Sequence, residues 1–340
     1  MNSKFLKGTA AVLVAVLFLV IIMLAIAKWE KSLEVLPSAE EPSEQSDFSE
    51  SEEEIRENLI YYDNAWYAYR DELTTVLFMG LDKFEEDQTL NRYSNSQQSD
   101  FLLLLVFDSE QNTCIPIQIN RDTIVEFPVL DIEGNNIGST TEQLALSHTY
   151  GSGKDDSCRN TAEAVSNLLY GVDIDHYVSV TMDAVQTLND LIGGVTVTVL
   201  DDFSGIDPAL EKGKEITLHG AQALTYVRTR MGLDDSTNLH RMERQRQYMT
   251  AFHEQFEKSI TDSQELLPLA LMEISSYMVS DCTADQLLEL YDRLNLCDTA
   301  DILTLEGEAV KEEKYMAFYP DEELLRATVI DIFYERKEAQ

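Results

Sequence analysis

Apolar residues recur at two spacings beyond residue 70, one typical of strands and the other of helices. Residues 74–81 and 101–107 are short apolar runs of strand length, and the second is apolar at every position. Such a run predicts a strand that is covered on both faces of a sheet. Isoleucines alternate with other residues over 115–119, and valines do so over 195–199. Both alternations predict half-buried strands.

Helical spacing appears between and after these strands. Apolar residues recur at helical intervals over 160–170 and over 182–192, where Gly193 and Gly194 stop the second helix. Nearer the C-terminus we expect helices over 266–278, 284–296 and 320–337, and a short strand over 301–304. Arg336 and Lys337 then fall in the last turn of the final helix, where the helix dipole favours cations. The succession predicts an α/β fold, a three-layer α/β/α sandwich around a central mixed sheet.

The N-terminal end has a different character. Residues 9–27 carry no charge and are almost wholly apolar, which is enough to cross a hydrocarbon core of about 30 Å as one transmembrane helix. Lys4 and Lys7 precede this segment, so we expect residues 1–8 in the cytoplasm and a single-pass anchor in the cell membrane, with the C-terminal part extracytoplasmic. A signal peptide cleaved after Ala27 is the alternative.

An acidic stretch follows the apolar segment. Between Glu34 and Glu57 there are ten acidic residues and one arginine. Such a composition predicts a disordered, self-repelling spacer, which we place at residues 28–70. The remaining chain divides into an α/β domain at residues 71–258 and a C-terminal α/β extension at 259–340 that packs on this core.

Arginines are concentrated in one segment of a chain whose formal net charge is -37. Five of the thirteen arginines fall within nineteen residues: Arg228, Arg230, Arg241, Arg244 and Arg246. A guanidinium matches phosphate geometry through paired hydrogen bonds, so the cluster predicts an anion site. The alternative is a solvated helix face that pairs with acidic residues. The strongly negative net charge argues against nucleic acid as a partner.

Two carboxylates and another arginine stand at the ends of predicted strands. Asp82 follows the first strand, Asp100 precedes the second, and Arg121 follows the third. Together they would form a cage for Mg²⁺ bridging a diphosphate, because hard cations prefer oxygen ligands. Aspartates at such junctions also serve as turn formers or caps, which is the alternative.

Four cysteines in an exported chain permit two disulfides. Sequence proximity favours a pair between Cys282 and Cys297, which leaves Cys114 and Cys158 for the second. Their spacing does not match a CxxC metal motif.

Several motifs resemble those of the LytR-CpsA-Psr family. They appear in the family's order over roughly residues 72–258: FMGLD, Ser99-Asp100, INRDT, LIGGVTVTV, LHGAQALTYVRTR and HRMERQRQ. The resemblance implies a membrane-anchored, extracytoplasmic enzyme of Gram-positive bacteria with an α/β/α fold. Such an enzyme transfers a glycopolymer, for example wall teichoic acid or capsule, from an undecaprenyl-diphosphate carrier at the cytoplasmic membrane to peptidoglycan.

The resemblance also implies roles for individual residues. Asp82 and Asp100 resemble the ligands of Mg²⁺, with Mn²⁺ as the alternative ion, and either one would take the proton of the attacking hydroxyl. Gln245 resembles the glutamine of the family's Arg-Gln pair. The implied diphosphate-binding residues are Arg121, Arg228, Arg230, Arg241 and Gln245. Arg121 and Arg228 are also implied to be catalytic, together with the two aspartates. We expect Arg244 to be structural and Arg246 to be solvated.

The chain departs from the family pattern at four positions. Phe84 replaces an arginine, Phe101 a threonine, Asn120 a proline and Asn238 an aspartate. Loss of an arginine and an aspartate near the site would alter phosphate binding or metal dependence. A non-catalytic, membrane-tethered protein that binds polyprenyl phosphate or regulates the cell envelope is therefore the alternative function.

Overall fold

The structure is a computed structural model of the chain. It describes residues 59–81, 97–229, 238–262, 277–299 and 302–337, together with residues 266, 269, 270 and 273. The predicted membrane segment at residues 9–27 and most of the predicted spacer lie outside the described residues. No helix among those described is long and apolar enough to cross a membrane.

A seven-stranded mixed sheet forms the centre of the molecule, with strand order β11-β8-β3-β4-β5-β12 and with β13 also paired to β5. Strand β4 is antiparallel to both of its neighbours, whereas β8 runs parallel to β3. The strands are β3 (Leu73–Leu81), β4 (Ser99–Asp108), β5 (Thr113–Ile119), β8 (His176–Thr181), β11 (Met278–Ser280), β12 (Asp298–Thr299) and β13 (Leu303–Thr304). The prediction of a central mixed sheet is therefore confirmed.

Strand β4 shows why the sheet is covered on both sides. Successive side chains of a strand point to opposite faces. Leu102 and Leu104 accordingly belong to one hydrophobic cluster, and Leu103 and Leu105 to another. None of the four is more than 1% exposed. The continuous apolar run thus forms a strand buried on both faces, as predicted.

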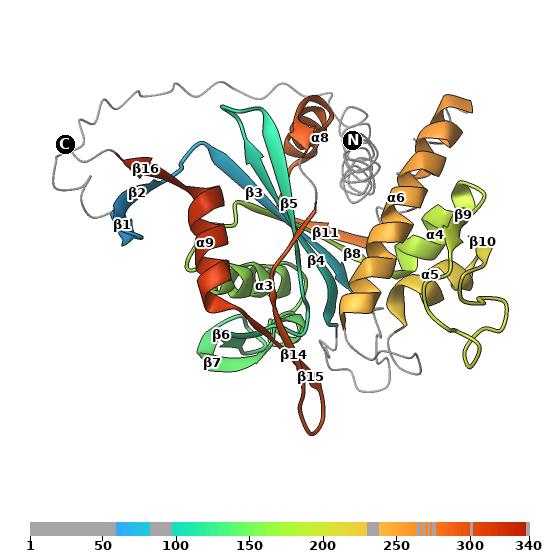
Figure 1. Cartoon of the computed structure of the whole chain (residues 1–340), viewed down its shortest axis with the longest axis horizontal. Helices are drawn as coiled ribbons and strands as arrows, with labels where there is room; N and C mark the ends of the chain where they lie inside the picture. Colours follow the sequence, from blue (N-terminus) through green and yellow to red (C-terminus); the bar gives the residue numbers. More distant parts are fainter. Residues whose placement is uncertain are drawn as a thin grey trace.

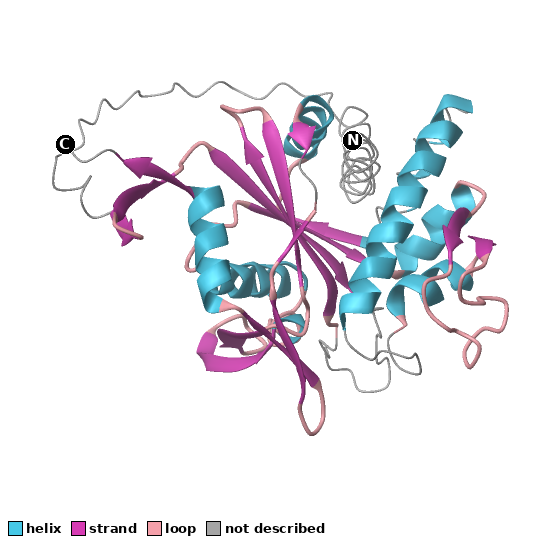
Figure 2. Cartoon of the chain, viewed as in Figure 1, coloured by secondary structure: helices cyan, strands magenta, loops and turns pink. Residues whose placement is uncertain are grey.

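Helices form the two outer layers (Figures 1 and 2). One face of the sheet packs against α3 (Lys154–Leu168) and α9 (Glu322–Phe333). The other face packs against α4 (Asp183–Leu191), α5 (Ala221–Arg228), α6 (Asn238–Asp262) and α8 (Ala284–Leu296). Beside α4 and α6 lies the pair β9 (Val195–Thr198) and β10 (Glu215–Leu218). The three layers match the sandwich that the periodic pattern predicted.

Two antiparallel hairpins were not predicted from the sequence. The first joins β6 (Ile124–Leu130) to β7 (Asn136–Gln143) and leads into the short helix η1 (Leu144–Leu146), and the second joins β14 (Gly307–Lys311) to β15 (Met316–Pro320). Strand β7 is mostly exposed and therefore lacks the apolar alternation that marks a half-buried strand.

The predicted spacer extends too far toward the C-terminus. Strands β1 (Leu59–Tyr62) and β2 (Ala65–Tyr69) form a hairpin, and β16 (Tyr334–Lys337) adds to it by pairing with β2. Tyrosine and tryptophan dominate β1 and β2 and favour strands. Residues 59–69 therefore belong to the folded part of the protein.

The same pairing corrects the final helix. Helix α9 ends at Phe333, and Arg336 lies opposite Tyr67 in the β16–β2 ladder. The expectation that Arg336 and Lys337 occupy a last helical turn is wrong, because cross-strand pairing with residues far away in the sequence overrides the local charge pattern.

The predicted boundary between residues 258 and 259 also fails. Helix α6 continues through it to Asp262, and strands β11, β12 and β13 from the C-terminal segment pair within the central sheet. The C-terminal segment is thus part of the same domain rather than a layer added to its outside. Helix α8 has the predicted bounds, whereas most of the helix predicted over 266–278 lies outside the described residues.

Candidate active site

Asp100 lies between two guanidinium groups at the start of β4. Its side chain is 5% exposed, and Arg121, which follows β5, pairs with its Oδ1 through Nη1. Arg241 in the first turn of α6 donates from Nη2 to the Asp100 carbonyl at 3.3 Å, and its Nη1 lies 3.6 Å from Asp100 Oδ1. The fold therefore brings together three predicted site residues that are up to 141 positions apart.

The turn that carries Arg121 is held by several hydrogen bonds. Thr123 donates to the Asn120 carbonyl from its amide at 3.1 Å and from its hydroxyl at 2.6 Å. Gln143 donates to Asp122 Oδ1 at 2.7 Å, and the Arg121 carbonyl accepts the amide of Ala145 at 2.9 Å. Arg121 itself is 8% exposed. Its guanidinium is thus held in place before any ligand arrives.

Helix α6 also holds the C-terminal end of α5 in place through hydrogen bonds. Arg244 is 1% exposed, and its guanidinium lies over the Phe203 ring at 5.3 Å. It donates from Nε to the Tyr226 carbonyl at 2.9 Å and from Nη2 to the Thr229 carbonyl, while Nη1 pairs with Asp201. The last carbonyls of a helix have no partner within the helix. Arg244 satisfies such groups and is structural, as predicted.

Gln245 contributes to the same junction. Its Nε2 donates to the Val227 carbonyl at 3.3 Å, and its side chain is buried. Residues four apart share one face of a helix, so Gln245 and Arg241 lie on the same face of α6. Gln245, one helical turn after Arg241 on α6, thus packs against the end of α5, which carries the exposed Arg228.

Two other predicted site residues, Asp82 and Arg230, lie outside the described residues, as does Phe84. Leu81, which precedes Asp82 in the sequence, pairs with Ser99. Phe101 packs opposite Gly80, where an added Cβ would come within 2.9 Å of the Phe101 Cβ. Because any side chain at position 101 has this Cβ, the contact explains the glycine at position 80 but not the replacement of threonine by Phe101.

The remaining two departures from the family pattern contact each other. Asn238 donates from Nδ2 to Asn120 Oδ1 at 2.8 Å, and both side chains are buried. The same Asn120 oxygen accepts the amide of Asp122 at 3.0 Å. This pair joins the start of α6 to the turn after β5, so it lies between the elements that carry Arg241 and Arg121. The sequence motifs gave no sign that these two positions meet.

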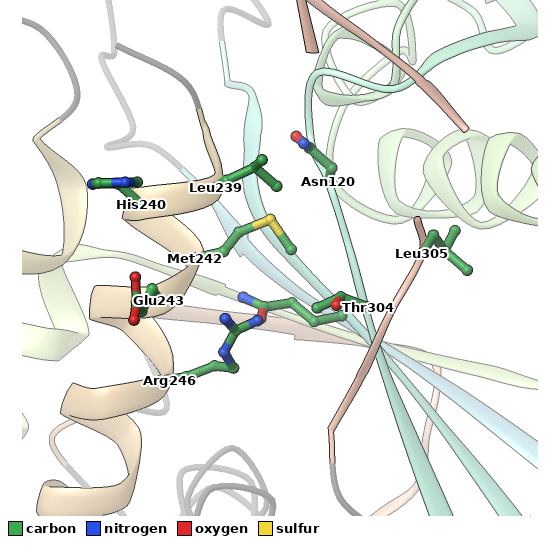
Figure 3. A pocket seen from close by; sticks show the side chains of 9 residues that line it. Asn120, Leu239, His240, Met242, Glu243, Arg246, Thr304 and Leu305 are labelled. Atoms are coloured by element: carbon green, nitrogen blue, oxygen red, sulfur yellow. The ribbon is translucent and has the colours of Figure 1, made fainter. Parts of the chain in front are cut away.

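A cavity of about 280 Å³ adjoins this pair. Figure 3 shows Leu239, Met242 and Arg246 projecting from α6 toward Asn120 and Leu305 on the opposite wall. The lining residues are Gln118, Asn120, Leu239, His240, Met242, Glu243, Arg246, Thr304 and Leu305. Five of them lie in the quoted motifs, and the other four carry no sequence signal, since the wall is assembled from three distant segments.

Arg246 is not the solvated residue that the sequence predicted. It is partly buried, and its Nη1 donates to Gln118 Oε1 at 3.2 Å across the cavity. Burial lowers the pKa of its guanidinium, and the nearby Glu243 partly offsets that effect. The basic segment therefore supplies one wall of the cavity as well as the arginines around Asp100.

Neither predicted disulfide fits the structure, where all four cysteines are free. Cys282 precedes α8 and Cys297 follows it. A helix of 13 residues is about 20 Å long, far beyond the Cα separation of a disulfide. Cys114 and Cys158 belong to hydrophobic clusters on opposite faces of the sheet. The sheet therefore separates the second pair.

Possible metal-binding side chains also meet at the start of β8. One possible ligand atom from each of His176, Asp281 and Cys282 lies within 4.8 Å of the other two. Gln286 Nε2 faces His176 Nε2 at 3.5 Å. The other ring nitrogen, Nδ1, lies 3.7 Å from Asp281 Oδ2.

Known proteins resemble this chain in sequence and in fold. The sequence profile of the LytR_cpsA_psr family matches residues 36–330. The polyisoprenyl-teichoic acid–peptidoglycan teichoic acid transferase TagU of Halalkalibacterium halodurans is 27% identical over 256 residues, which span 74% of this chain and 76% of that protein. TagU of Bacillus subtilis is 31% identical over 173 residues, 51% of this chain and 49% of that protein. The crystal structure of Bacillus subtilis TagV superposes with a TM-score of 0.54 at 25% identity, over 77% of this chain and 97% of that one.

Proposed function

The chain belongs to the LytR-CpsA-Psr family, and on that premise we propose that it is a glycopolymer transferase acting on peptidoglycan. Its donor substrate is a polymer carried on a polyprenyl diphosphate. The observation that carries the proposal is the placement of Arg121 and Arg241 on either side of Asp100. Teichoic acid transferases among the relatives, named for their action on peptidoglycan, support the choice of substrates.

Diphosphate binding uses guanidinium groups that Asp100 holds in place beforehand. Arg121 and Arg241 are both buried, so they lose little conformational freedom when a ligand arrives. Arg228 is exposed at the end of α5 and supplies a third cation. Guanidinium–phosphate hydrogen bonds are charge-assisted and often paired, which suits a diphosphate better than a single lysine would.

A divalent ion fits the same group of residues. Asp100 offers the carboxylate oxygens that Mg²⁺ or Mn²⁺ prefers, and Asp82 would supply a second carboxylate. When bound, the ion would stabilise negative charge on the phosphate oxygens.

The reaction is a transfer of the glycosyl phosphate. A sugar hydroxyl of peptidoglycan attacks the phosphorus next to the polymer, and the bond from that phosphorus to the bridging oxygen breaks. Polyprenyl monophosphate leaves, a phosphodiester forms, and the hydroxyl proton passes to Asp100 or Asp82. Arg121, Arg228 and Arg241 stabilise the charge that develops on the phosphate oxygens.

The polyprenyl chain requires an apolar site, since each methylene left in water costs about 0.8 kcal/mol. Leu239, Met242 and Leu305 supply apolar surface in the cavity beside Asn120. Its 280 Å³ is below the range of about 300–1,000 Å³ for ligand pockets. We therefore assign only the first prenyl units to it. The apolar segment at residues 9–27 would anchor the protein in the cell membrane and hold the site on the extracytoplasmic side.

The test is a transfer assay with the full chain in detergent, a synthetic polyprenyl-diphosphate-linked saccharide, peptidoglycan and Mg²⁺. Arg228→Ala should lower the rate about 100-fold or more, the effect of removing one donor to a developing oxyanion. Arg336→Ala is the matched control, because Arg336 is an exposed arginine on β16. The alternative function, a non-catalytic lipid-phosphate binder, requires tight binding of the donor without product, and that result would exclude the transferase.

A further inference from the structure

We propose that Cys114 and Cys297 form a disulfide that links strand β5 to the end of helix α8. Cys114 lies within β5 and is 0% exposed, while Cys297 is the C-cap of α8 and is partly exposed. The Cys297 thiol lies close enough to the Cys114 thiol to raise its pKa. This pairing differs from both pairings that sequence proximity favoured.

Strand register explains why the two cysteines meet. Strand β12 starts directly after Cys297 and runs parallel to β5, with Thr299 opposite Cys114. Side chains two residues apart in an extended segment point to the same side. Cys297 is therefore a diagonal neighbour of Cys114 on one face of the sheet. Both cysteines also pack in the same hydrophobic cluster. Diagonal neighbours lie about 7–8 Å apart between Cα atoms, so closing the bond requires the end of α8 to shift toward β5 by about 1 Å.

The difference in exposure between Cys114 and Cys297 determines which thiol reacts first. The nearby Cys297 thiol and burial raise the pKa of the Cys114 thiol, so it is a poor first nucleophile. The Cys297 thiolate attacks the disulfide of a thiol–disulfide oxidoreductase, or of a small disulfide, and releases one thiol. Cys114 then loses its proton and attacks the mixed disulfide at the Cys297 sulfur, releasing the second thiol. Two cysteine thiols are oxidised while one donor disulfide is reduced.

The bond would stabilise a wall of the cavity. Strands β12 and β13 both pair with β5, and Thr304 and Leu305 at the end of β13 line the cavity. Cross-linking positions 114 and 297 closes a long loop of the unfolded chain, which favours the folded state. The proposal rests on the strand register and the thiol contact, so it is independent of the transferase reaction.

Full-length protein purified under reducing conditions and then treated with oxidised glutathione provides the test. Remaining thiols are alkylated after unfolding, and peptides are mapped by mass spectrometry without reduction. We expect one cross-linked peptide pair containing Cys114 and Cys297, with Cys158 and Cys282 alkylated. A thermal scan should show a Tm several degrees higher after oxidation, and dithiothreitol should reverse that rise. A link between any other two cysteines, or four unlinked cysteines, would overturn the proposal.

Two variants give matched controls. Cys282→Ser should leave both the cross-link and the Tm rise intact, whereas Cys297→Ser should abolish both. Cys297 is partly exposed, so its substitution tests the pair without altering the buried side of the contact. A Tm rise that persists in Cys297→Ser would show that oxidation stabilises the protein through some other group, and it would refute the proposed disulfide.

Discussion

The contact between Asn238 and Asn120 can be tested by one change of a donor into an acceptor. Asn238→Asp keeps the shape of the side chain but replaces the Nδ2 that donates to Asn120 Oδ1 at 2.8 Å. A carboxylate oxygen would then face an amide oxygen. Rotating the Asn120 amide would present its nitrogen instead, but that movement would remove the acceptor of the Asp122 amide.

The expected cost follows from burial and hydrogen bonding. Asn120 and Asn238 are only 4% and 3% exposed, so water cannot replace the lost partner. The hydrogen bond contributes about 1 kcal/mol, and a buried polar group without a partner costs about 1–3 kcal/mol. We therefore expect Asn238→Asp to lower the free energy of unfolding by about 2–4 kcal/mol.

A double-mutant cycle in urea isolates the pairwise energy. Asn120→Ala removes the amide oxygen that the new carboxylate would face. The double variant should therefore lose about 1–3 kcal/mol less unfolding free energy than the two single variants lose in sum. Asn167→Asp is the control, because Asn167 donates to the Glu126 carbonyl at 3.1 Å on the exposed surface; its cost should stay within about 0.5 kcal/mol. Additive single changes, or an Asn238→Asp cost equal to that control, would refute the reasoning.

Three further predictions concern stability. Burial lowers the pKa of His148 from 6.5 to about 4, so between these pH values the unfolded state binds more protons than the folded state. The free energy of unfolding should therefore fall as pH drops from 6.5 to 4, by about 2–3 kcal/mol near pH 4.5 in urea melts. His148→Gln should reduce this pH dependence. Arg244→Met should cost about 3–5 kcal/mol of unfolding free energy, since it removes one partner of a buried ion pair; a cost below 1 kcal/mol would contradict the structural role. Gly80→Ala should cost about 1–3 kcal/mol because its Cβ meets Phe101 at 2.9 Å, whereas Gly205→Ala, with nothing within 4 Å, should be nearly neutral in the same denaturation assay.

The apolar pattern of the sequence predicted the strands that are buried on one or both faces. Strands β3, β4 and β5 were found within two residues of their observed ends because their apolar side chains meet covering layers on the sheet. Strand β7 has no such face, and β12 and β13 are only two residues each. Their pairing with β5 depends on contacts from far along the chain, which a local pattern does not contain.

The candidate site was predicted only where a motif or a strand end marked it. Asp100 and Arg121 stand at strand ends, and Arg241 belongs to a quoted motif, so their convergence was expected. The Asn120–Asn238 contact, the cavity and the meeting of Cys114 with Cys297 arise from tertiary packing. For the cysteines, proximity in sequence was misleading, because a rigid helix separates Cys282 from Cys297.

The arginine-rich segment performs two tasks that activity measurements alone would confuse. Arg241 reaches Asp100, whereas Arg244, three residues later, holds the carbonyls at the end of α5. Loss of Arg244 would displace Arg228 and so reduce turnover without removing any group that touches the substrate. Because Arg228 is exposed, its substitution should change the unfolding free energy by no more than about 1 kcal/mol. A loss of transfer at unchanged stability therefore identifies a ligand-binding arginine, and a parallel loss of both identifies a positioning residue.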